Sequence, residues 1–250
     1  MLVHGSWGDH HNWDPVVAGL AETFRTFTYD RRGHSQSERL PTQGTIDDDV
    51  ADLAAFIKAN RLAPAHVAGN SFGAAITLKL AAVQPELFAS ATAHEPPLIG
   101  MLENHPALPV VRERIGAVVN TLRSGDLEAG ARQFVENVAL GPGMWEKLPA
   151  EMQKTFVFNA PTWLDEMNEP ETVMAVDLPR LGRFTRPLLI TRGDHSPPFF
   201  YAILDKIGAA VPHVQEYTFR GAGHVPHLTH RDEYVRVLTE FAQRGKLPAD

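Results

Sequence analysis

The part of the sequence that most constrains the fold is the short stretch Gly69-Asn70-Ser71-Phe72-Gly73. It lies between an apolar run from Pro64 to Ala68, which predicts a strand, and a run from Ala74 to Gln84, which predicts a helix. A serine flanked by glycines two positions away on either side is typical of a sharp strand-to-helix turn that exposes the side chain. We therefore expect an exposed hydroxyl at Ser71, beside the backbone N–H with which Phe72 opens the helix.

A serine hydroxyl is a weak nucleophile unless a neighbouring base takes its proton. The sequence offers such a base at His224, which stands between Gly223 and Val225-Pro226. A strand-like run from Val214 to Phe219 precedes it, and the spacing of Thr229 and Asp232 predicts a helix capping box after it. His224 is therefore expected on a loop, where small neighbours let its ring approach the serine. His227 and His230 stand nearer the helix, and we expect both at the surface.

A nucleophilic serine also needs a second backbone donor that points at the same developing negative charge as the Phe72 amide. The turn His4-Gly5-Ser6-Trp7-Gly8 offers one near the start of the chain. We expect the Ser6 amide to complete an oxyanion hole with that of Phe72. The amide of Trp7 is the neighbouring alternative.

The composition agrees with one soluble enzyme domain that carries an insertion. With 250 residues, 44% of them hydrophobic, the chain can bury one sizeable core. The net charge of −7 and the lack of clustered Lys and Arg argue against nucleic acid or an anionic membrane as partner. The absence of cysteine excludes disulfides, a thiolate nucleophile and Cys-ligated metal, and it fits a cytoplasmic location. No run approaches the roughly 20 apolar residues of a membrane span.

Twelve histidines raise the question of a metal site. His10 and His11 are adjacent, so they do not easily face one ion from a regular element, and no carboxylate at helical ligand spacing accompanies them. We expect these two at the surface or at a pocket rim, and His66 and His213 at the surface or a strand edge. The sequence therefore predicts no metal and no cofactor.

Several motifs together make the chain resemble the α/β-hydrolase superfamily over nearly its whole length. They occur in the order His4-Gly5, Tyr29-Asp30-Arg31-Arg32-Gly33-His34, Gly69 to Gly73 and Gly223-His224. Agreement in order and spacing is more specific than any one motif. The resemblance implies a mostly parallel sheet flanked by helices, and a serine nucleophile followed along the chain by an acid and a histidine. For Asp30 and Arg32 we expect pairing with other residues of the scaffold rather than a part in the chemistry.

The acid of this expected triad departs from the commonest family pattern. That pattern has an aspartate three residues after the glycine that ends the strand 187–192, and here Ser196 occupies the position. Asp194, directly after Gly193, is the one carboxylate of that loop. Other members that resemble this chain carry the acid after the strand 87–93, where Glu95 precedes two prolines. We favour Glu95, because the prolines fix its loop and its longer side chain suits a distant anchor, and we keep Asp194 as the alternative.

The segment 98–181 carries helical patterns alone, which predicts a helical cap inserted over the carboxyl ends of the strands. We expect residues 1–97 and 182–250 to form the α/β-hydrolase core. Family members usually have a two-stranded hairpin before the oxyanion strand, whereas only three residues precede His4. Either the sheet is reduced to about six strands or upstream residues are missing. Nine large apolar residues are candidates for a pocket wall, although core packing is the better explanation for each one taken singly. They are Trp145, Met152, Phe156, Phe158, Trp163, Met167, Met174, Phe199 and Phe200.

The expected reaction is hydrolysis of an ester or related acyl bond in a small, largely apolar substrate, as in a carboxylesterase. His224 takes the Ser71 proton during attack on a carbonyl carbon, Glu95 orients His224, and water releases the acyl-enzyme. Because fold does not settle reaction, a C–C bond hydrolase, a lyase, a cofactor-free oxygenase and a low-turnover ligand-binding receptor stay open. A small molecule is the one expected partner, and the sequence leaves the oligomeric state open.

Overall fold

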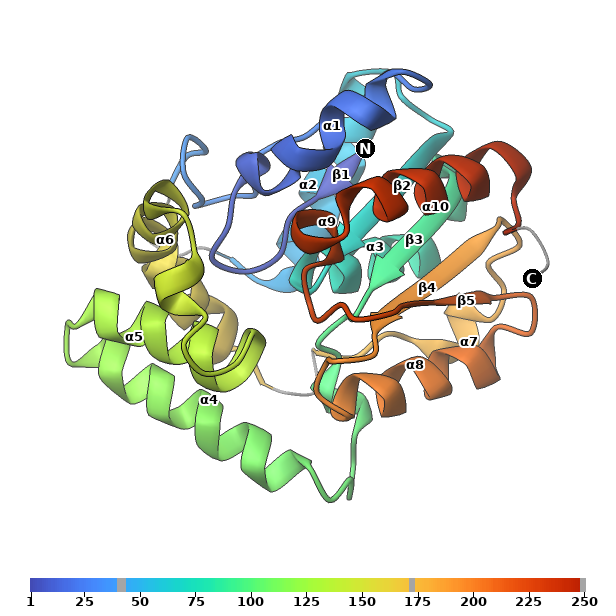
Figure 1. Ribbon diagram of the computed structural model, residues 1–250. Coiled ribbons are helices and arrows are strands. Elements are labelled where there is room, and N and C mark those ends of the chain that lie inside the picture. The colour runs from blue at the N-terminus through green and yellow to red at the C-terminus, as the bar shows by residue number, and fades with distance from the viewer. Residues whose placement is uncertain (40–43, 171–173, 248–250) are drawn as a thin grey trace.

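A parallel five-stranded sheet forms the centre of the computed structural model, which describes residues 1–39, 44–170 and 174–247 (Figure 1). The strands stand in the order β1-β2-β3-β4-β5. Their bounds are β1 Leu2–Val3, β2 Ala65–Asn70, β3 Phe88–His94, β4 Leu188–Gly193 and β5 Gln215–Phe219. A single parallel bridge joins Leu2 to Thr28. The described sheet therefore has five strands and one isolated bridge, rather than about six strands.

The strand register brings the carboxyl ends of three neighbouring strands to one edge. Asn70 pairs with His94 between β2 and β3, and His94 pairs with Thr191 between β3 and β4. The residues that follow these strand ends, Ser71 and Glu95, consequently leave the sheet side by side. This edge is the place where open parallel sheets assemble their sites.

Helices cover both faces of the sheet, as near-continuous apolar strands require. One face packs against α1 and α10, and the opposite face packs against α2, α3 and α8. The bounds of the helices around the sheet are α1 Asp14–Ala21, α2 Ile46–Ala59, α3 Phe72–Val83, α7 Leu178–Leu181, α8 Phe199–Ala210, α9 Pro226–Thr229 and α10 Arg231–Arg244. Short 3-10 helices are η1 His10–Trp13, η2 Pro85–Leu87, η3 Ile99–Met101 and η5 Trp145–Lys147.

Two predicted helix starts had different outcomes. Thr45 and Asp48 stand three residues apart in the sequence, a spacing that predicts a capping box. This box is confirmed at the start of α2, because the Thr45 hydroxyl accepts from the Asp48 N–H and the Asp48 carboxylate accepts from the Thr45 N–H. The box predicted from Thr229 and Asp232 is wrong. Thr229 ends the short helix α9 and its hydroxyl donates to the Val225 carbonyl, while His230 is the N-cap of α10 without a side-chain cap.

Three helices between β3 and β4 form a lobe beside the carboxyl ends of the strands (Figure 1). We call them the inserted helices: α4 Leu108–Arg123, α5 Leu127–Phe134, which continues into the π-helical turn η4 Val135–Ala139, and α6 Ala150–Asn168. They bury an apolar cluster of their own, into which Trp7 from the first loop of the core inserts. Within the described residues, the structure contains no helix that is long and apolar enough to cross a membrane.

Candidate active site

Ser71 stands at the tip of a strained turn between β2 and α3. Its φ of 55° and ψ of −124° lie outside the favoured regions for a residue with a side chain. A Cβ built on Gly69 would lie 2.2 Å from the Gly73 carbonyl oxygen, and one on Gly73 would lie 2.2 Å from the Val3 carbonyl oxygen. Only glycine at these two positions allows the strand and the helix to approach so closely. The structure thus contains the strand, sharp turn and helix that the sequence predicts around Ser71.

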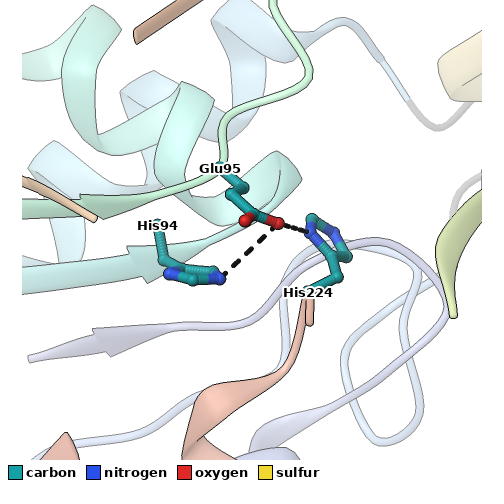
Figure 2. Close-up of side chains that lie close together, drawn as sticks. All are labelled: His94, Glu95 and His224. Atoms are coloured by element: carbon teal, nitrogen blue, oxygen red, sulfur yellow. Dashed lines mark hydrogen bonds and ion pairs between the residues drawn. The ribbon is translucent and has the colours of Figure 1, made fainter. Parts of the chain in front are cut away.

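Figure 2 shows that Glu95, directly after β3, reaches His224 on the loop after β5. Glu95 Oε2 lies 2.6 Å from His224 Nδ1, and Glu95 Oε1 accepts the Gly193 N–H at 2.7 Å. Because a carboxylate accepts, the Nδ1–H of His224 is the donor and its Nε2 remains free to take a proton. The His224 carbonyl in turn accepts from the Asn70 side-chain amide at 2.9 Å, which ties the loop to the end of β2.

The environment keeps Glu95 ionised although its side chain is fully buried. Burial raises the pKa of this carboxyl, but the charge interaction with His94 and the hydrogen bond and charge interaction with His224 outweigh it and lower the pKa to about 2. His94 Nε2 lies 3.6 Å from Glu95 Oε2. A permanently charged carboxylate can hold His224 in one orientation and stabilise its protonated form.

Asp194 has a different environment from Glu95. Its Oδ1 accepts the Gly221 N–H at 2.7 Å, and its side chain is 40% exposed. The imidazole of His195 lies near Asp194, with its Nε2 3.9 Å from Asp194 Oδ1. Of the two carboxylates that the sequence left open, the structure brings Glu95 into contact with His224, whereas Asp194 braces the turn at Gly221.

Ser71 and His224 line one cavity of about 70 Å³, together with Ser6 and Phe72. His224 is also stacked on Phe200, with ring centroids 4.8 Å apart. The rest of the wall is aromatic and aliphatic and comes largely from the inserted helices and α8. It includes Phe134, Val138, Trp163, Met167, Met174 and Phe199. His224 is the one titratable side chain among the described residues of this wall.

Other large apolar residues of the inserted segment do not reach this cavity wall. Trp145 and Phe156 pack in the cluster of the inserted helices, and Phe158 is 57% exposed. Trp7, the alternative oxyanion residue, has φ of 69° and stacks on Phe134 with ring centroids 4.9 Å apart. Ser6, by contrast, lines the cavity. Phe134 and Val138 escaped the sequence prediction because helical periodicity does not reveal which buried face meets the cavity.

The prediction that His227 lies at the surface is wrong. Only 1% of its surface is exposed, and the centroids of its ring and the Trp13 ring are 4.6 Å apart. Burial, reinforced by the neighbouring His94 and His224, lowers the pKa of His227 to about 3. Because the short helix α9 turns this residue inward, the chain places a neutral imidazole behind His224. His213 is exposed as expected, whereas His230 is half-buried. His66 is half-buried on β2, where its Nδ1 lies 2.8 Å from the Ser90 hydroxyl.

Two groups of described residues bring metal-ligating atoms within 4.8 Å of one another. One is His94, Glu95 and His224, discussed above. The other is Asp9, His10 and Asp30, where His10 Nδ1 lies 2.6 Å from Asp30 Oδ1. The carboxylates of this second group already accept backbone N–H groups, that of Asp30 from His10 and Gln36 and that of Asp9 from His11. These hydrogen bonds explain both carboxylates as braces of the loops at the start of the chain.

A model of the alpha/beta hydrolase fold matches residues 1–231. The chain belongs to this family. Arg32 of this alpha/beta hydrolase pairs with Asp52 at 2.7 Å, and Asp30 with His10, which agrees with the scaffold pairing expected for Asp30 and Arg32.

Comparison with known proteins gives relatives of several activities. An uncharacterized hydrolase of Bacillus subtilis is 40% identical over 111 residues, which are 42% of this chain and 40% of that protein. The 3-oxoadipate enol-lactonase 1 of Acinetobacter baylyi is 37% identical over 34% of this chain and 31% of its own. The first curated relatives are thus matched over only 24% to 40% of their length. The solved structure of the enol-lactonase from Burkholderia xenovorans has a TM-score of 0.79 at 19% identity, covering 97% of this chain and 90% of that one, and shares the fold.

Proposed function

We propose that this alpha/beta hydrolase is a serine hydrolase that cleaves an ester or related acyl bond through an acyl-enzyme. The observation that carries the proposal is the 2.6 Å contact between buried Glu95 and His224, beside a cavity that His224 shares with the strained Ser71. A nucleophile, a base and an orienting carboxylate on three loops of one sheet edge are the parts that nucleophilic catalysis by serine requires.

In the proposed mechanism, His224 Nε2 takes the hydroxyl proton as Ser71 Oγ attacks the carbonyl carbon. The carbonyl oxygen becomes negative and is stabilised by the N–H groups of Phe72 and Ser6, each worth about 3 kcal/mol. The protonated His224 then gives its proton to the leaving group, and the acyl group stays on Ser71. Attack by water, with His224 again as base, releases the acid and restores the enzyme. Each step uses groups of the chain itself, with no cofactor.

The cavity wall supports a neutral, apolar acyl group as the part of the substrate next to Ser71. A carboxylate or ammonium group held there would meet aromatic and aliphatic side chains such as Trp163 and Phe199, and burying an unpaired charge among them is costly. We assign the segment 98–181 the role of a cap, because α6 and the turn after α5 supply one wall of the cavity. The enol-lactonase name of the Acinetobacter baylyi relative agrees with acyl-bond hydrolysis. We expect the reaction to be cytoplasmic.

Labelling with a fluorophosphonate tests the nucleophile directly. We expect stoichiometric labelling of the native protein, loss of labelling in Ser71→Ala and full labelling in the control Ser124→Ala, whose serine is exposed at the end of α4. p-Nitrophenyl esters of rising chain length would then be screened as substrates. Absence of labelling in a folded protein would exclude the proposal and favour a receptor, whereas labelling without ester turnover would point to another reaction of this fold.

A further inference from the structure

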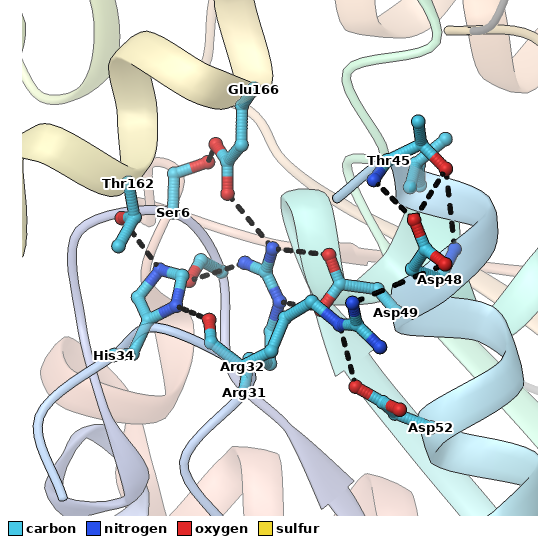
Figure 3. Close-up of polar contacts among 12 residues, drawn as sticks. Ser6, Arg31, Arg32, His34, Thr45, Asp48, Asp49, Asp52, Thr162 and Glu166 are labelled. Carbon is cyan, nitrogen blue, oxygen red and sulfur yellow. Dashed lines mark hydrogen bonds and ion pairs between the residues drawn. The ribbon is translucent and has the colours of Figure 1, made fainter. Parts of the chain in front are cut away.

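The hydroxyl of Ser6, beside the cavity, is held by a carboxylate from an inserted helix. Ser6 Oγ donates to Glu166 Oε2 at 2.5 Å, across 160 residues of sequence. The carboxylate of Glu166 is buried near the end of α6, with 7% exposure. Figure 3 shows Glu166 between Ser6 and the guanidinium of Arg31, which donates from Nη2 to Glu166 Oε1 at 2.8 Å. One buried carboxylate therefore holds two groups of the core at once.

Arg31 lies against Phe72 and against the carbonyl of the Gly5–Ser6 peptide group. Its side chain is 1% exposed and is fixed by two hydrogen bonds to Asp49, at 3.1 and 3.0 Å. Its guanidinium carbon lies 4.4 Å from the ring centroid of Phe72, the residue after Ser71. Its Nη1 donates to the Gly5 carbonyl at 3.3 Å. The planar guanidinium of an arginine can donate several hydrogen bonds at once, which suits it to fixing several groups in a set geometry.

The hydrogen bonds to the Gly5 carbonyl determine where the Ser6 N–H points, because both belong to one peptide group. Among the described residues the one cis bond is Ala63–Pro64, so the Gly5–Ser6 peptide is trans and its N–H points opposite to its C=O. The Gly5 carbonyl also lies 2.8 Å from His4 Nδ1, while His4 Nε2 accepts the Arg31 N–H at 2.9 Å. His4 Nδ1 therefore carries the hydrogen, and two donors on one side of the peptide turn the Ser6 N–H to the other.

The same loop lies directly against the nucleophile. A Cβ built on Gly5 would lie 2.9 Å from the Cβ of Ser71, closer than real Cβ contacts allow. A small rotation of the Gly5–Ser6 peptide would therefore change the geometry at Ser71, and misplacement of catalytic groups by about 1 Å can cost about a hundredfold in rate.

Two further residues on the same face of α6 fasten the helix to the neighbouring loops. The Asn159 side-chain amide donates to the carbonyls of Trp7 and Gly8 at 3.2 and 3.0 Å and accepts from the Ser35 N–H at 2.8 Å. Thr162 Oγ1 lies 3.0 Å from His34 Nε2. Asn159 and Thr162 are three residues apart, and Thr162 and Glu166 are four apart, so all three lie on one side of the helix. The position of α6 is thereby transmitted to residue 6.

We propose that Glu166 is a positioning residue for the oxyanion hole, through which helix α6 holds the Ser6 hydroxyl and the Arg31 guanidinium so that the Ser6 N–H faces the reacting carbonyl oxygen. This inference rests on the proposed function. It goes beyond it in tying the inserted helices to the chemical step as well as to the substrate pocket.

Steady-state kinetics of Glu166→Ala, Glu166→Gln and Ser6→Ala on a p-nitrophenyl ester test the role. We expect Glu166→Ala and Ser6→Ala to lower kcat about ten- to hundredfold with KM within about twofold, because the oxyanion forms only in the transition state. Glu166→Gln should recover most of kcat, since its amide can accept from Arg31 and donate to the Ser6 hydroxyl. The control is Asp165→Ala, the neighbouring carboxylate on α6, which should leave kcat unchanged.

The affinity for phenylboronic acid, which forms a tetrahedral adduct with an active serine, adds a readout that a merely structural role would not move. It should weaken in parallel with kcat in Glu166→Ala and Ser6→Ala, at unchanged circular dichroism. Should Glu166→Ala fail to fold, Ser6→Ala carries the test, because the ion pair of Arg31 with Glu166 stays intact there. Native kcat and boronate affinity in folded Ser6→Ala, with Ser71 labelled normally, would overturn the inference and leave the proposed function standing. A native protein that neither labels nor turns over esters would end both.

Discussion

The contact between Glu95 and His224 predicts a large loss of activity in Glu95→Gln. A glutamine of the same size can still accept the Gly193 N–H, so the substitution removes the charge with little change of shape. Its amide would also donate to His224 Nδ1, which moves the ring proton to Nε2, where it blocks uptake of the Ser71 proton. Both effects act on the transition state, in which His224 becomes charged.

The size of the effect follows from the geometry. With 2.6 Å between Oε2 and Nδ1, the centres of the two charges lie about 4 Å apart, and their attraction is about 4 kcal/mol at an effective dielectric constant of about 20. Losing about 4 kcal/mol of transition-state stabilisation lowers kcat about a thousandfold. The matched control is Asp194→Asn, whose partner is the Gly221 N–H, and its kcat should stay within about threefold of native.

The measurement is hydrolysis of one p-nitrophenyl ester by the native protein and both variants, each checked for native circular dichroism. Burst kinetics separate formation of the acyl-enzyme from its hydrolysis, and both steps should slow in Glu95→Gln, because His224 acts as base in each. Retention of more than a tenth of native kcat in Glu95→Gln, or a greater loss in Asp194→Asn, would show that Glu95 is not the acid.

Two further predictions concern buried His227 and the cavity wall. Burial is the main cause that lowers the pKa of His227 to about 3, below the value of about 6.5 for a histidine in the unfolded chain. Below about pH 6.5 the unfolded state therefore binds a proton at this residue that the folded state does not bind. The free energy of unfolding consequently falls as the pH falls. The free energy of unfolding lost between pH 6.5 and 5 should be about 2 kcal/mol smaller in His227→Phe by urea titration, and an equal loss in both proteins contradicts this account. Trp163→Ala should shift the preferred p-nitrophenyl ester to a longer acyl chain, because it enlarges the cavity beside Ser71, whereas Phe158→Ala, at an exposed position, should leave the chain-length profile unchanged.

Sequence reasoning succeeded where a structure is determined by neighbours in the chain. The turn around Ser71 depends on glycines two residues away, and the box of Thr45 and Asp48 closes within one helical turn. Both signals can be read in a window of a few residues. The strands before Ser71 and Glu95 also have local signals, although they end at Asn70 and His94 rather than at Ala68 and residue 93.

It failed where the environment of a side chain comes from distant segments. His227 was expected at the surface because its ring partners, Trp13 and Tyr234, cannot be seen from the local pattern. The predicted capping box at Thr229 does not form because Thr229 belongs to the short helix α9. The link between Ser6 and Glu166 spans most of the chain and has no local signal. Periodicity reveals that a helix has a buried face, but it does not tell which polar groups that face meets.

The anchoring of α6 by Asn159, Thr162 and Glu166 has a consequence for engineering new specificities in this fold. A graft that brings in a foreign lid while keeping the host loops would separate Glu166 from Ser6 and Asn159 from Ser35. Chimeras should therefore retain activity when the transplanted module carries its own counterparts to the loop residues at 6, 34 and 35, and should fold but work poorly when it does not.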